Sequence, residues 1–380
     1  MQKTLLVTID FPPMFGGVAS YWSNLAKCFP PDNFMVLAPD FDRSLDFDME
    51  QSYLIYRKKL LSKSKWVWPK WLPLLIETYK IVRREKIRYL IVTHVLPAGT
   101  VVWILKKLLN VKYIVSLHGL DISLAANSER KKRIAKMILQ GSDSILVNSN
   151  YTKMLLGEKL CKSCAEKAEE VYPCPNIVYK EIAPEKIEQF KQKNGIEGNK
   201  IVLTVGRLIE RKGQSEVIKA ISHIQNSISD VTYIVVGGGS EKEHLKELTR
   251  SLKLNDRVLF FDDIQDEELP YFYHMADVFI MPVKELADGD VEGFGIVYLE
   301  ANAYGLPVIA GKSGGAQEAV EHGLNGLLVD ANNSNEVSQA LISLLTNKEK
   351  AKQLGENGRR RQKEIFTWRK QVSKILEILK

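Results

Sequence analysis

The sequence predicts an α/β protein with two domains, each built on a parallel β-sheet that helices cover on both faces. Apolar strand-like runs alternate with amphipathic segments, such as residues 98–109 and 129–140, over nearly the whole chain. Such alternation is typical of parallel strands joined by crossover helices. It breaks in a polar stretch after Pro175 and then restarts. The length of 380 residues suits two domains of about 150 to 200 residues each.

The strand-like runs give the order of the expected elements. They are residues 3–9, 34–39, 89–94, 112–119 and 144–150 in the first half, and 200–206, 231–239, 257–261, 277–282, 307–311 and 326–329 in the second. We therefore expect one domain at 1–180 and a second at 181–365. A C-terminal helix follows at 366–380, and one option is that it crosses back to the first domain.

Composition indicates a globular protein, with 45% hydrophobic and 26% charged residues. The first apolar run is short and ends at Asp10, unlike a signal peptide, and no apolar stretch reaches the roughly 18 residues of a membrane span. We expect a cytoplasmic protein. Cys161 and Cys164 are spaced C-x-x-C, but no second pair completes a zinc-binding set, so reduced thiols are favoured over zinc.

The net charge of +7 is unevenly spread, because residues 57–70 contain six basic residues and no acidic one. Basic residues interleaved with tryptophan suit an anionic membrane surface. A solvated loop is an equally open alternative, and nucleic acid is disfavoured because no nucleic-acid-binding motif accompanies the charge. The candidate membrane contacts are Lys58, Lys59, Lys63, Lys65, Trp66, Trp68 and Trp71.

Two strand-end loops have residues suited to binding phosphate, since open α/β sheets bind ligands beyond the carboxyl ends of their strands. Gly16 and Gly17 precede a helix, where glycine lets backbone N–H groups approach an anion. Arg207 and Lys212 follow the first strand of the second domain and could neutralise a diphosphate leaving group without a metal. The alternatives are an ordinary tight turn and a solvated basic loop.

Glu292 and Glu300 stand eight residues apart, with Gly293 and Gly295 between them and an apolar helix that begins near Phe294. Backbone N–H groups at the start of such a helix can bind phosphate. Glu300, about two turns inside the helix, could accept hydrogen bonds from ribose hydroxyls. Glu292 lies on the preceding loop and could contact a sugar hydroxyl.

Together these motifs resemble the family 4 retaining glycosyltransferases of GT-B fold, whose hallmark is E-x7-E. The resemblance spans nearly the whole chain and includes H-G-x-D at 118–121, N-S-N-Y-T at 148–152, G-R-x4-K-G at 206–213 and S-G-G-x2-E at 313–318. Within the family, the chain is most similar to phosphatidylinositol mannosyltransferases and related GDP-mannose-dependent enzymes. The resemblance implies two Rossmann-like domains facing across a cleft, with the acceptor in the first and the nucleotide sugar in the second.

The resemblance also implies roles for individual residues. The implied catalytic residues are His118, Arg207, Lys212 and Glu292. The implied donor-binding residues are Gly16, Gly17, Arg207, Lys212, Gly237, Ile264, Glu292, Gly293, Phe294, Gly295, Ile296, Val297 and Glu300. The expected partners are a nucleotide-sugar donor and a lipid-linked or glycan acceptor, with no cofactor or metal. The expected location is cytoplasmic, at the inner face of the cell membrane if the basic segment binds lipid.

One position departs from the family pattern. Asp262 stands after the third strand of the second domain, where the family commonly has glycine, so the donor base stays open between guanine and uracil. The D-x-D sequence at Asp288–Asp290 precedes the E-x7-E helix, and we expect a loop there rather than a metal site.

The resulting hypothesis is a hexosyltransferase that retains anomeric configuration by front-face displacement, with GDP-mannose as the favoured donor and an α-linked product. One alternative is a UDP-sugar-dependent glycosyltransferase of polysaccharide or lipopolysaccharide synthesis. Others are a sugar-nucleotide epimerase with the same two-domain fold and a non-catalytic subunit that binds nucleotide sugars. A dehydrogenase is disfavoured because no G-x-G-x-x-G follows the first strand.

Overall fold

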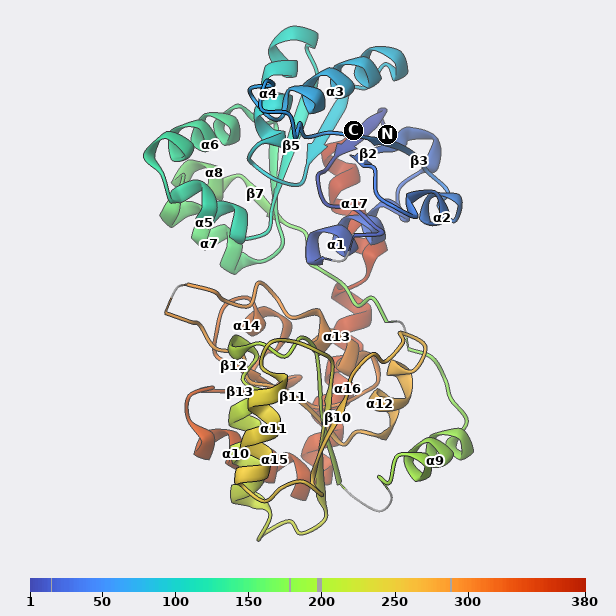
Figure 1. Ribbon diagram of the computed structural model, residues 1–380, viewed down its shortest axis with the longest axis vertical. Helices are drawn as coiled ribbons and strands as arrows, with labels where there is room; N and C mark the ends of the chain where they lie inside the picture. Colours follow the sequence, from blue (N-terminus) through green and yellow to red (C-terminus); the bar gives the residue numbers. More distant parts are fainter. Residues whose placement is uncertain (15, 178, 197–199, 288) are drawn as a thin grey trace. The chain divides into compact units, whose positions relative to one another are not determined.

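The computed structural model describes residues 1–14, 16–177, 179–196, 200–287 and 289–380. They form two compact units: Met1–Cys174 together with Trp368–Lys380, and Pro175–Thr367 (Figure 1). The units divide after Cys174 rather than at residue 180, and the C-terminal helix belongs to the first unit. Each unit contains one parallel sheet, which confirms the expected α/β class with two Rossmann-like sheets.

The first unit has a seven-stranded sheet in the order β3-β2-β1-β4-β5-β6-β7. Its strands are β1 (Thr4–Val7), β2 (Phe34–Pro39), β3 (Leu54–Lys58), β4 (Tyr89–Val92), β5 (Lys112–Leu117), β6 (Ser144–Val147) and β7 (Ala168–Glu170). Its helices are α1 (Gly17–Ala26), η1 (Pro31–Asn33), α2 (Ser44–Met49), α3 (Leu72–Glu85), α4 (Ala98–Leu109), α5 (Leu120–Ala126), α6 (Glu129–Gly141), α7 (Asn150–Lys159), α8 (Lys162–Glu166) and α17 (Trp368–Ile378). The strand order 3-2-1-4-5-6 is that of dinucleotide-binding folds.

Alternate side chains of this sheet enter two separate cores, because successive residues of a strand point to opposite faces. Leu5 packs with residues of α3, α4, α6 and α7 on one face. Leu6 packs with residues of α1 and α17 on the other face. Burial of both faces explains why the strands are continuous apolar runs in the sequence.

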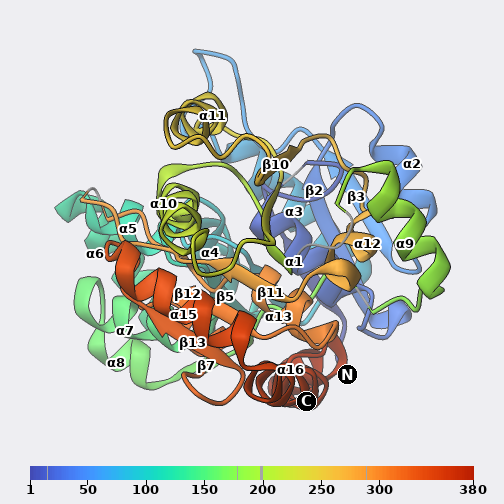
Figure 2. The same cartoon turned by 90° about the horizontal axis from the view of Figure 1, so that it is seen from below.

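The second unit has a six-stranded sheet in the order β10-β9-β8-β11-β12-β13. Its strands are β8 (Lys200–Val205), β9 (Val231–Val236), β10 (Val258–Phe261), β11 (Val278–Met281), β12 (Val308–Gly311) and β13 (Gly326–Val329). Its helices are α9 (Pro184–Lys193), η2 (Glu210–Lys212), α10 (Gln214–Ile224), α11 (Lys242–Ser251), α12 (Leu269–Met275), α13 (Ile296–Ala303), α14 (Ala316–Ala319), α15 (Ser334–Thr346) and α16 (Lys348–Ile365). Figure 2 shows α10 beside α15, which share a core with β8 and β9.

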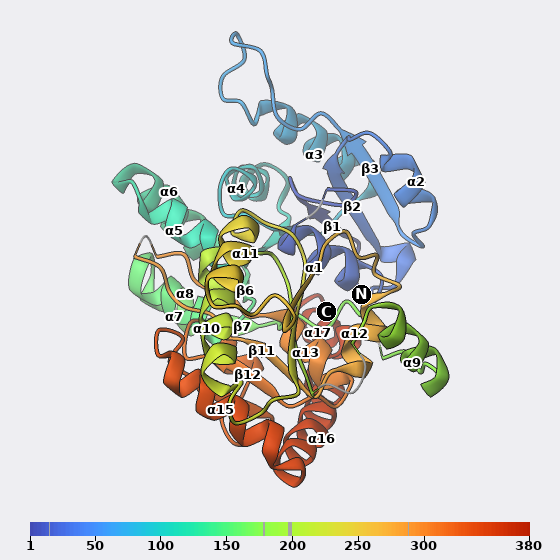
Figure 3. The same cartoon turned by 60° about the horizontal axis from the view of Figure 1, so that its bottom comes forward.

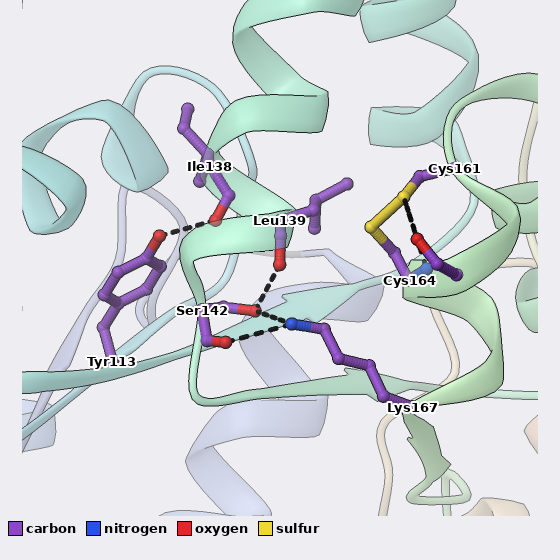
Figure 4. Close-up of a disulfide and its surroundings, with 8 residues drawn as sticks. Tyr113, Ile138, Leu139, Ser142, Cys161, Cys164 and Lys167 are labelled. Atoms are coloured by element: carbon purple, nitrogen blue, oxygen red, sulfur yellow. Dashed lines mark hydrogen bonds between the residues drawn. A yellow bond between two sulfur atoms is a disulfide. The ribbon is translucent and has the colours of Figure 1, made fainter.

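Cys161 and Cys164 form a disulfide at the start of α8 (Figure 4). The expectation of reduced thiols is therefore wrong for this pair. Cys161 is the N-cap residue of α8 and its sulfur accepts a hydrogen bond from the Cys164 N–H at 3.2 Å, so the helix start places the two Cα atoms 5.2 Å apart. That separation lies within the usual range for a disulfide. Cys28 and Cys174 are free thiols.

Among the helices of the described ranges, none is both long enough and apolar enough to cross a lipid bilayer.

The C-terminal helix α17 completes the core of the first unit. Ile375 is fully buried there, and the side chain of Gln371 accepts a hydrogen bond from the backbone N–H of Tyr172 at 2.9 Å. We predict that Ile375→Ala lowers the free energy of unfolding of the first unit by about 2–5 kcal/mol. Glu377→Ala, at an exposed position of the same helix, is the matched control and should change it by less than about 0.5 kcal/mol.

Tryptophan fluorescence during urea denaturation measures this effect, because every tryptophan of the chain belongs to the first unit. They are Trp22, Trp66, Trp68, Trp71, Trp103 and Trp368. Equal unfolding midpoints for the wild type and Ile375→Ala would contradict the role of α17 in this core.

Candidate active site

The loop after β8 brings the predicted basic residues of the second unit to the carboxyl end of its sheet. Lys212 ends the short helix η2, and Gly213 follows it with a φ of 73°. A Cβ atom at Gly213 would lie 2.1 Å from the carbonyl oxygen of Pro282, so only glycine lets this loop lie against the end of β11. β8 and β11 are neighbours at the point where the strand order reverses, which is where such sheets bind ligands.

Glu292 accepts hydrogen bonds from two cations of this loop. Its Oε2 atom contacts Lys212 Nζ, and it lies 2.6 Å from Arg211 Nη1. Arg211 also donates from Nε to Asp290 at 3.0 Å. The side chains of Lys212, Arg211 and Glu292 are almost fully buried. The structure thus brings two predicted residues, Lys212 and Glu292, into direct contact.

Electrostatics keep the Glu292 carboxylate ionised. Burial by itself raises its pKa, but the charges and hydrogen bonds of Lys212 and Arg211 outweigh burial, so the pKa of Glu292 is lowered. Sequence reasoning missed Arg211, although its position directly before Lys212 was a signal. Asp288, the first residue of the D-x-D sequence, lies outside the described residues, and Asp290 binds Arg211.

The helix α13 begins at Ile296, four residues after Glu292, and its first backbone N–H groups have no partner within the helix, as in every α-helix. Gly295 is its N-cap residue with a φ of 86°, and a Cβ atom there would lie 2.3 Å from the ring of Tyr298. Ile296 and Val297 form the half-buried first turn. The ring of Phe294, in contrast, is buried and packs against Phe366 at 5.6 Å.

The Glu292–Gly293 backbone also packs against the S-G-G motif. The N–H of Gly315 donates to the carbonyl of Glu292 at 2.9 Å, and a Cβ atom at Gly315 would lie 2.0 Å from the carbonyl oxygen of Gly293. The loops after β8, β11 and β12 therefore meet at Glu292.

Glu300 is buried inside α13 and its carboxylate is occupied by groups of the same unit. Oε1 accepts from the backbone N–H groups of Asn176 and Ile177 at 3.2 and 3.4 Å, and Oε2 accepts from the Tyr273 hydroxyl at 3.0 Å. Burial raises the pKa of Glu300, and these hydrogen bonds oppose the shift. Glu300 therefore holds the start of this unit against α12 and α13.

The other predicted donor-binding residues of the second unit occupy strand-end loops. Arg207 is exposed after β8, outside the buried ion cluster. Gly237 follows β9 with a φ of 129°, and half-buried Ile264 follows β10. Asp262, at the position where the family commonly has glycine, pairs with Lys242.

In the first unit, His118 follows β5 at the carboxyl edge of the sheet. Its backbone N–H donates to Asp121 at 3.0 Å, its Nε2 lies 3.2 Å from the Ser116 hydroxyl, and its ring lies edge-on to Tyr21 at 5.2 Å. Burial lowers the pKa of His118 to about 3. At neutral pH this imidazole is therefore uncharged and acts as a hydrogen-bonding group.

Sequence reasoning missed a second polar pair at the same edge. Asp10 follows β1, His94 follows β4, and the Asp10 Oδ2 lies 3.1 Å from His94 Nε2. The hydrogen bond from His94 lowers the pKa of Asp10. The signal was available, because Asp10 stands just beyond one predicted strand and His94 is the last residue of another. Gly16 and Gly17 lie nearby in sequence, at the exposed start of α1, with open space where a Cβ would be.

The predicted membrane segment is the loop between β3 and α3, which extends away from the rest of the first unit (Figure 3). Trp66 and Trp68 are 96% and 79% exposed. Trp71 differs from them, because it precedes α3 and packs against the core of the first unit. The predicted lysines are exposed: Lys58 at the end of β3, and Lys59, Lys63 and Lys65 in the loop.

The chain matches two family models. The model described as Glycosyltransferase Family 4 matches residues 15–172, and the one described as Glycosyl transferases group 1 matches residues 186–361. Together they cover both units.

Individual relatives agree with this assignment. The chain is 28% identical over 380 residues to the GDP-mannose-dependent alpha-(1-6)-phosphatidylinositol monomannoside mannosyltransferase of Mycolicibacterium smegmatis, covering 99% of this chain and 97% of that protein. It is 28% identical over 391 residues to the GDP-mannose-dependent monoacylated alpha-(1-6)-phosphatidylinositol monomannoside mannosyltransferase of Corynebacterium glutamicum, covering 100% and 98%.

A solved structure shows the same fold. The crystal structure of Anabaena Alr3699/HepE in complex with UDP is similar with a TM-score of 0.82 at 22% identity, covering 100% of this chain and 99% of that one. With both parallel sheets, the E-x7-E loop and two family models in agreement, the chain is a glycosyltransferase of GT-B fold and belongs to glycosyltransferase family 4.

Proposed function

We propose that this enzyme transfers mannose from GDP-mannose to a lipid-linked or glycan acceptor, with retention of configuration and without a metal. The observation that supports it most is the buried cluster of Arg211, Lys212 and Glu292 beside the start of α13. It places fixed positive charge and free helix N–H groups at one strand-end site, as binding of a diphosphate requires. The mannosyltransferase relatives support the choice of sugar and base.

In this proposal the second unit binds the donor. Lys212 and Arg207 contact the diphosphate, together with the N–H groups of Ile296 and Val297. Glu300 contacts the ribose. To do so, its carboxylate must share or give up some of the hydrogen bonds that it accepts within the protein. Gly237 and Ile264 lie beside the nucleoside. Glu292 contacts the transferred sugar while remaining paired with its two cations.

The first unit binds the acceptor, and the reaction is a single displacement on one face of the sugar. The bond between the anomeric carbon and the phosphate oxygen breaks, and a new bond forms to the acceptor oxygen. The acceptor proton passes to the departing phosphate oxygen, whose negative charge Lys212 and Arg207 stabilise. Neutral His118 can hydrogen-bond the sugar without adding charge, since its pKa is about 3.

A UDP-sugar donor is the second candidate, because Asp262 stands where the family commonly has glycine beside the base. We predict that hydrolysis and transfer are fastest with GDP-mannose among GDP-mannose, UDP-glucose, UDP-galactose and UDP-N-acetylglucosamine. The rates should be unchanged by EDTA, because side-chain cations occupy the phosphate site. A UDP sugar as the preferred donor would overturn the choice of donor. Loss of turnover with EDTA, restored by magnesium or manganese, would overturn the metal-free mechanism.

We predict that substitution of Glu300, but not of Glu292, weakens GDP binding. Glu292→Gln removes the carboxylate that Lys212 and Arg211 share, and Arg211 keeps its contact with Asp290. Breaking a buried pair of this kind costs about 3–5 kcal/mol of stability. GDP supplies a replacement anion, so calorimetry should show unchanged or tighter GDP binding while transfer falls steeply. Glu300→Gln should weaken GDP binding roughly ten- to hundredfold, the value of a hydrogen bond to a charged group.

Glu243→Gln is the control for this pair, because it removes an exposed carboxylate of α11 and should leave binding and transfer unchanged. If Glu292→Gln weakened GDP binding as much as Glu300→Gln does, the assignment of the two carboxylates would be wrong.

We further propose that the loop between β3 and α3 docks the enzyme on anionic lipid, which places it at the inner face of the cell membrane. Exposed Trp66 and Trp68 suit the headgroup region, and the lysines attract anionic lipid. A double substitution Lys63→Ala with Lys65→Ala should weaken binding to phosphatidylglycerol-containing vesicles about thirtyfold at low salt, at about 1 kcal/mol per charge. Trp66→Ala with Trp68→Ala should also weaken it.

The matched control is Lys348→Ala with Lys352→Ala, which removes two exposed charges from α16 of the second unit. Co-sedimentation with vesicles measures binding, and it should decrease as salt rises or anionic lipid is omitted. If the loop variants and the control bind vesicles equally, the loop is a solvated one.

A further inference from the structure

Asp10 and His94 form a polar pair at the switch point of the first sheet, and the proposed function gives neither a role. β1 and β4 are parallel neighbours there, and the helices that follow them lie on opposite faces of the sheet. Crevices outside the carboxyl ends of strands at such a point are the usual ligand-binding places of open α/β sheets. The pair therefore lies where the first unit is expected to bind its substrate.

Two buried threonines hold the His94 ring in place. The Thr8 hydroxyl donates to the Asp10 carbonyl at 2.8 Å and lies 2.9 Å from the Thr93 hydroxyl. The Thr93 hydroxyl in turn lies 2.8 Å from His94 Nδ1. The other nitrogen, Nε2, faces the Asp10 carboxylate. Since a carboxylate can only accept, Nε2 donates the hydrogen bond of this pair.

The Asp10 carboxylate is held on one side only. Its ion pair with His94 uses Oδ2, and among the described residues no hydrogen bond to Oδ1 is found. The Asp10 side chain is 29% exposed and the His94 side chain 18%. Oδ1 can thus accept a hydrogen bond from a ligand while Oδ2 remains fixed.

We propose that His94 is a positioning residue for sugar transfer: it holds the Asp10 carboxylate ionised and in one orientation, and Asp10 accepts a hydrogen bond from the reacting hydroxyl of the acceptor. The inference rests on the proposed function, in which the first unit binds the acceptor. Asp10 orients the hydroxyl and remains a carboxylate, because the acceptor proton still passes to the departing phosphate oxygen. The lowered pKa of Asp10 agrees with this role, since it makes the carboxylate a weak base.

Two further titratable groups face the pair. His118, from the end of β5, acts on Asp10 through its charge when protonated, and its pKa of about 3 keeps it neutral near pH 7. Asp121 lies in the first turn of α5. Burial raises its pKa, and the charge of His94 opposes that shift. Loss of His94 should therefore change the titration of Asp10 directly, whereas His118 titrates at lower pH.

Two amide variants separate positioning from folding. In His94→Gln the side-chain amide can reach the position of Nε2 and still donate to Asp10. In His94→Asn the shorter amide reaches only the position of Nδ1, beside Thr93. Both variants keep a polar group at the site, and thermal unfolding and GDP calorimetry should be unchanged in both.

With GDP-mannose and phosphatidylinositol monomannoside in mixed micelles, we expect His94→Asn to lower kcat roughly ten- to hundredfold with an unchanged donor KM. His94→Gln should retain a kcat several-fold higher than that of His94→Asn. The acid limb of the pH profile should move to higher pH in His94→Asn, because the Asp10 pKa is no longer lowered. Equal kcat values in the wild type and His94→Asn, or equal losses in both variants, would overturn the inference.

A titration that needs no turnover tests the same pair if the transfer assay fails. The carboxyl signal of Asp10, observed with 13C-labelled aspartate and assigned by its loss in Asp10→Asn, should titrate at higher pH in His94→Asn than in the wild type. An unchanged titration would overturn the inference. Absence of mannose transfer by the wild type with a normal Asp10 titration shift would count against the proposed function alone.

Discussion

The site of the second unit depends on the ion pairs that the ionised carboxylate of Glu292 makes with Arg211 and Lys212. Two cations on consecutive residues are buried beside it: Lys212 pairs with it, and Arg211 is shared between it and Asp290. The same residue accepts a backbone hydrogen bond from Gly315. The side chain and the backbone carbonyl of Glu292 therefore connect the loops after β8, β11 and β12. The cost of burying Arg211 and Lys212 is therefore offset by carboxylates of the protein itself.

The two sheets share a strand order, but different polar side chains lie at the carboxyl ends of their strands. Each follows the order 3-2-1-4-5-6, and in each the polar groups cluster where the chain leaves the two central strands. In the second unit these groups are cations and helix N–H groups suited to an anion. In the first they are Asp10, His94 and a neutral His118, suited to hydroxyl groups. The difference in charge favours different substrates in the two units.

The sequence predicted the fold well because both faces of each sheet are buried, which makes every central strand a continuous apolar run. It also located the E-x7-E segment and the Lys212 loop, since strand ends and glycines are visible in the chain. It could not pair Asp10 with His94 or Arg211 with Glu292, because those contacts depend on which strands are neighbours. The disulfide was missed because its geometry is set by the short helix α8. The contact of partly buried Trp71 with the core was missed because it depends on tertiary packing.

The return of α17 to the first unit has a consequence for synthesis of the chain. Val372, Ile375 and Leu379 are buried in the core of the first unit, yet they leave the ribosome after the whole of the second unit. Domains generally fold as units while the chain is being made. The second unit ends at Thr367, so it can finish folding before the first unit does. Until α17 has been synthesised, the face of the first unit that carries α1 lacks this helix. The first unit is therefore completed after the second, and its apolar α1 face stays exposed to aggregation until α17 has been made.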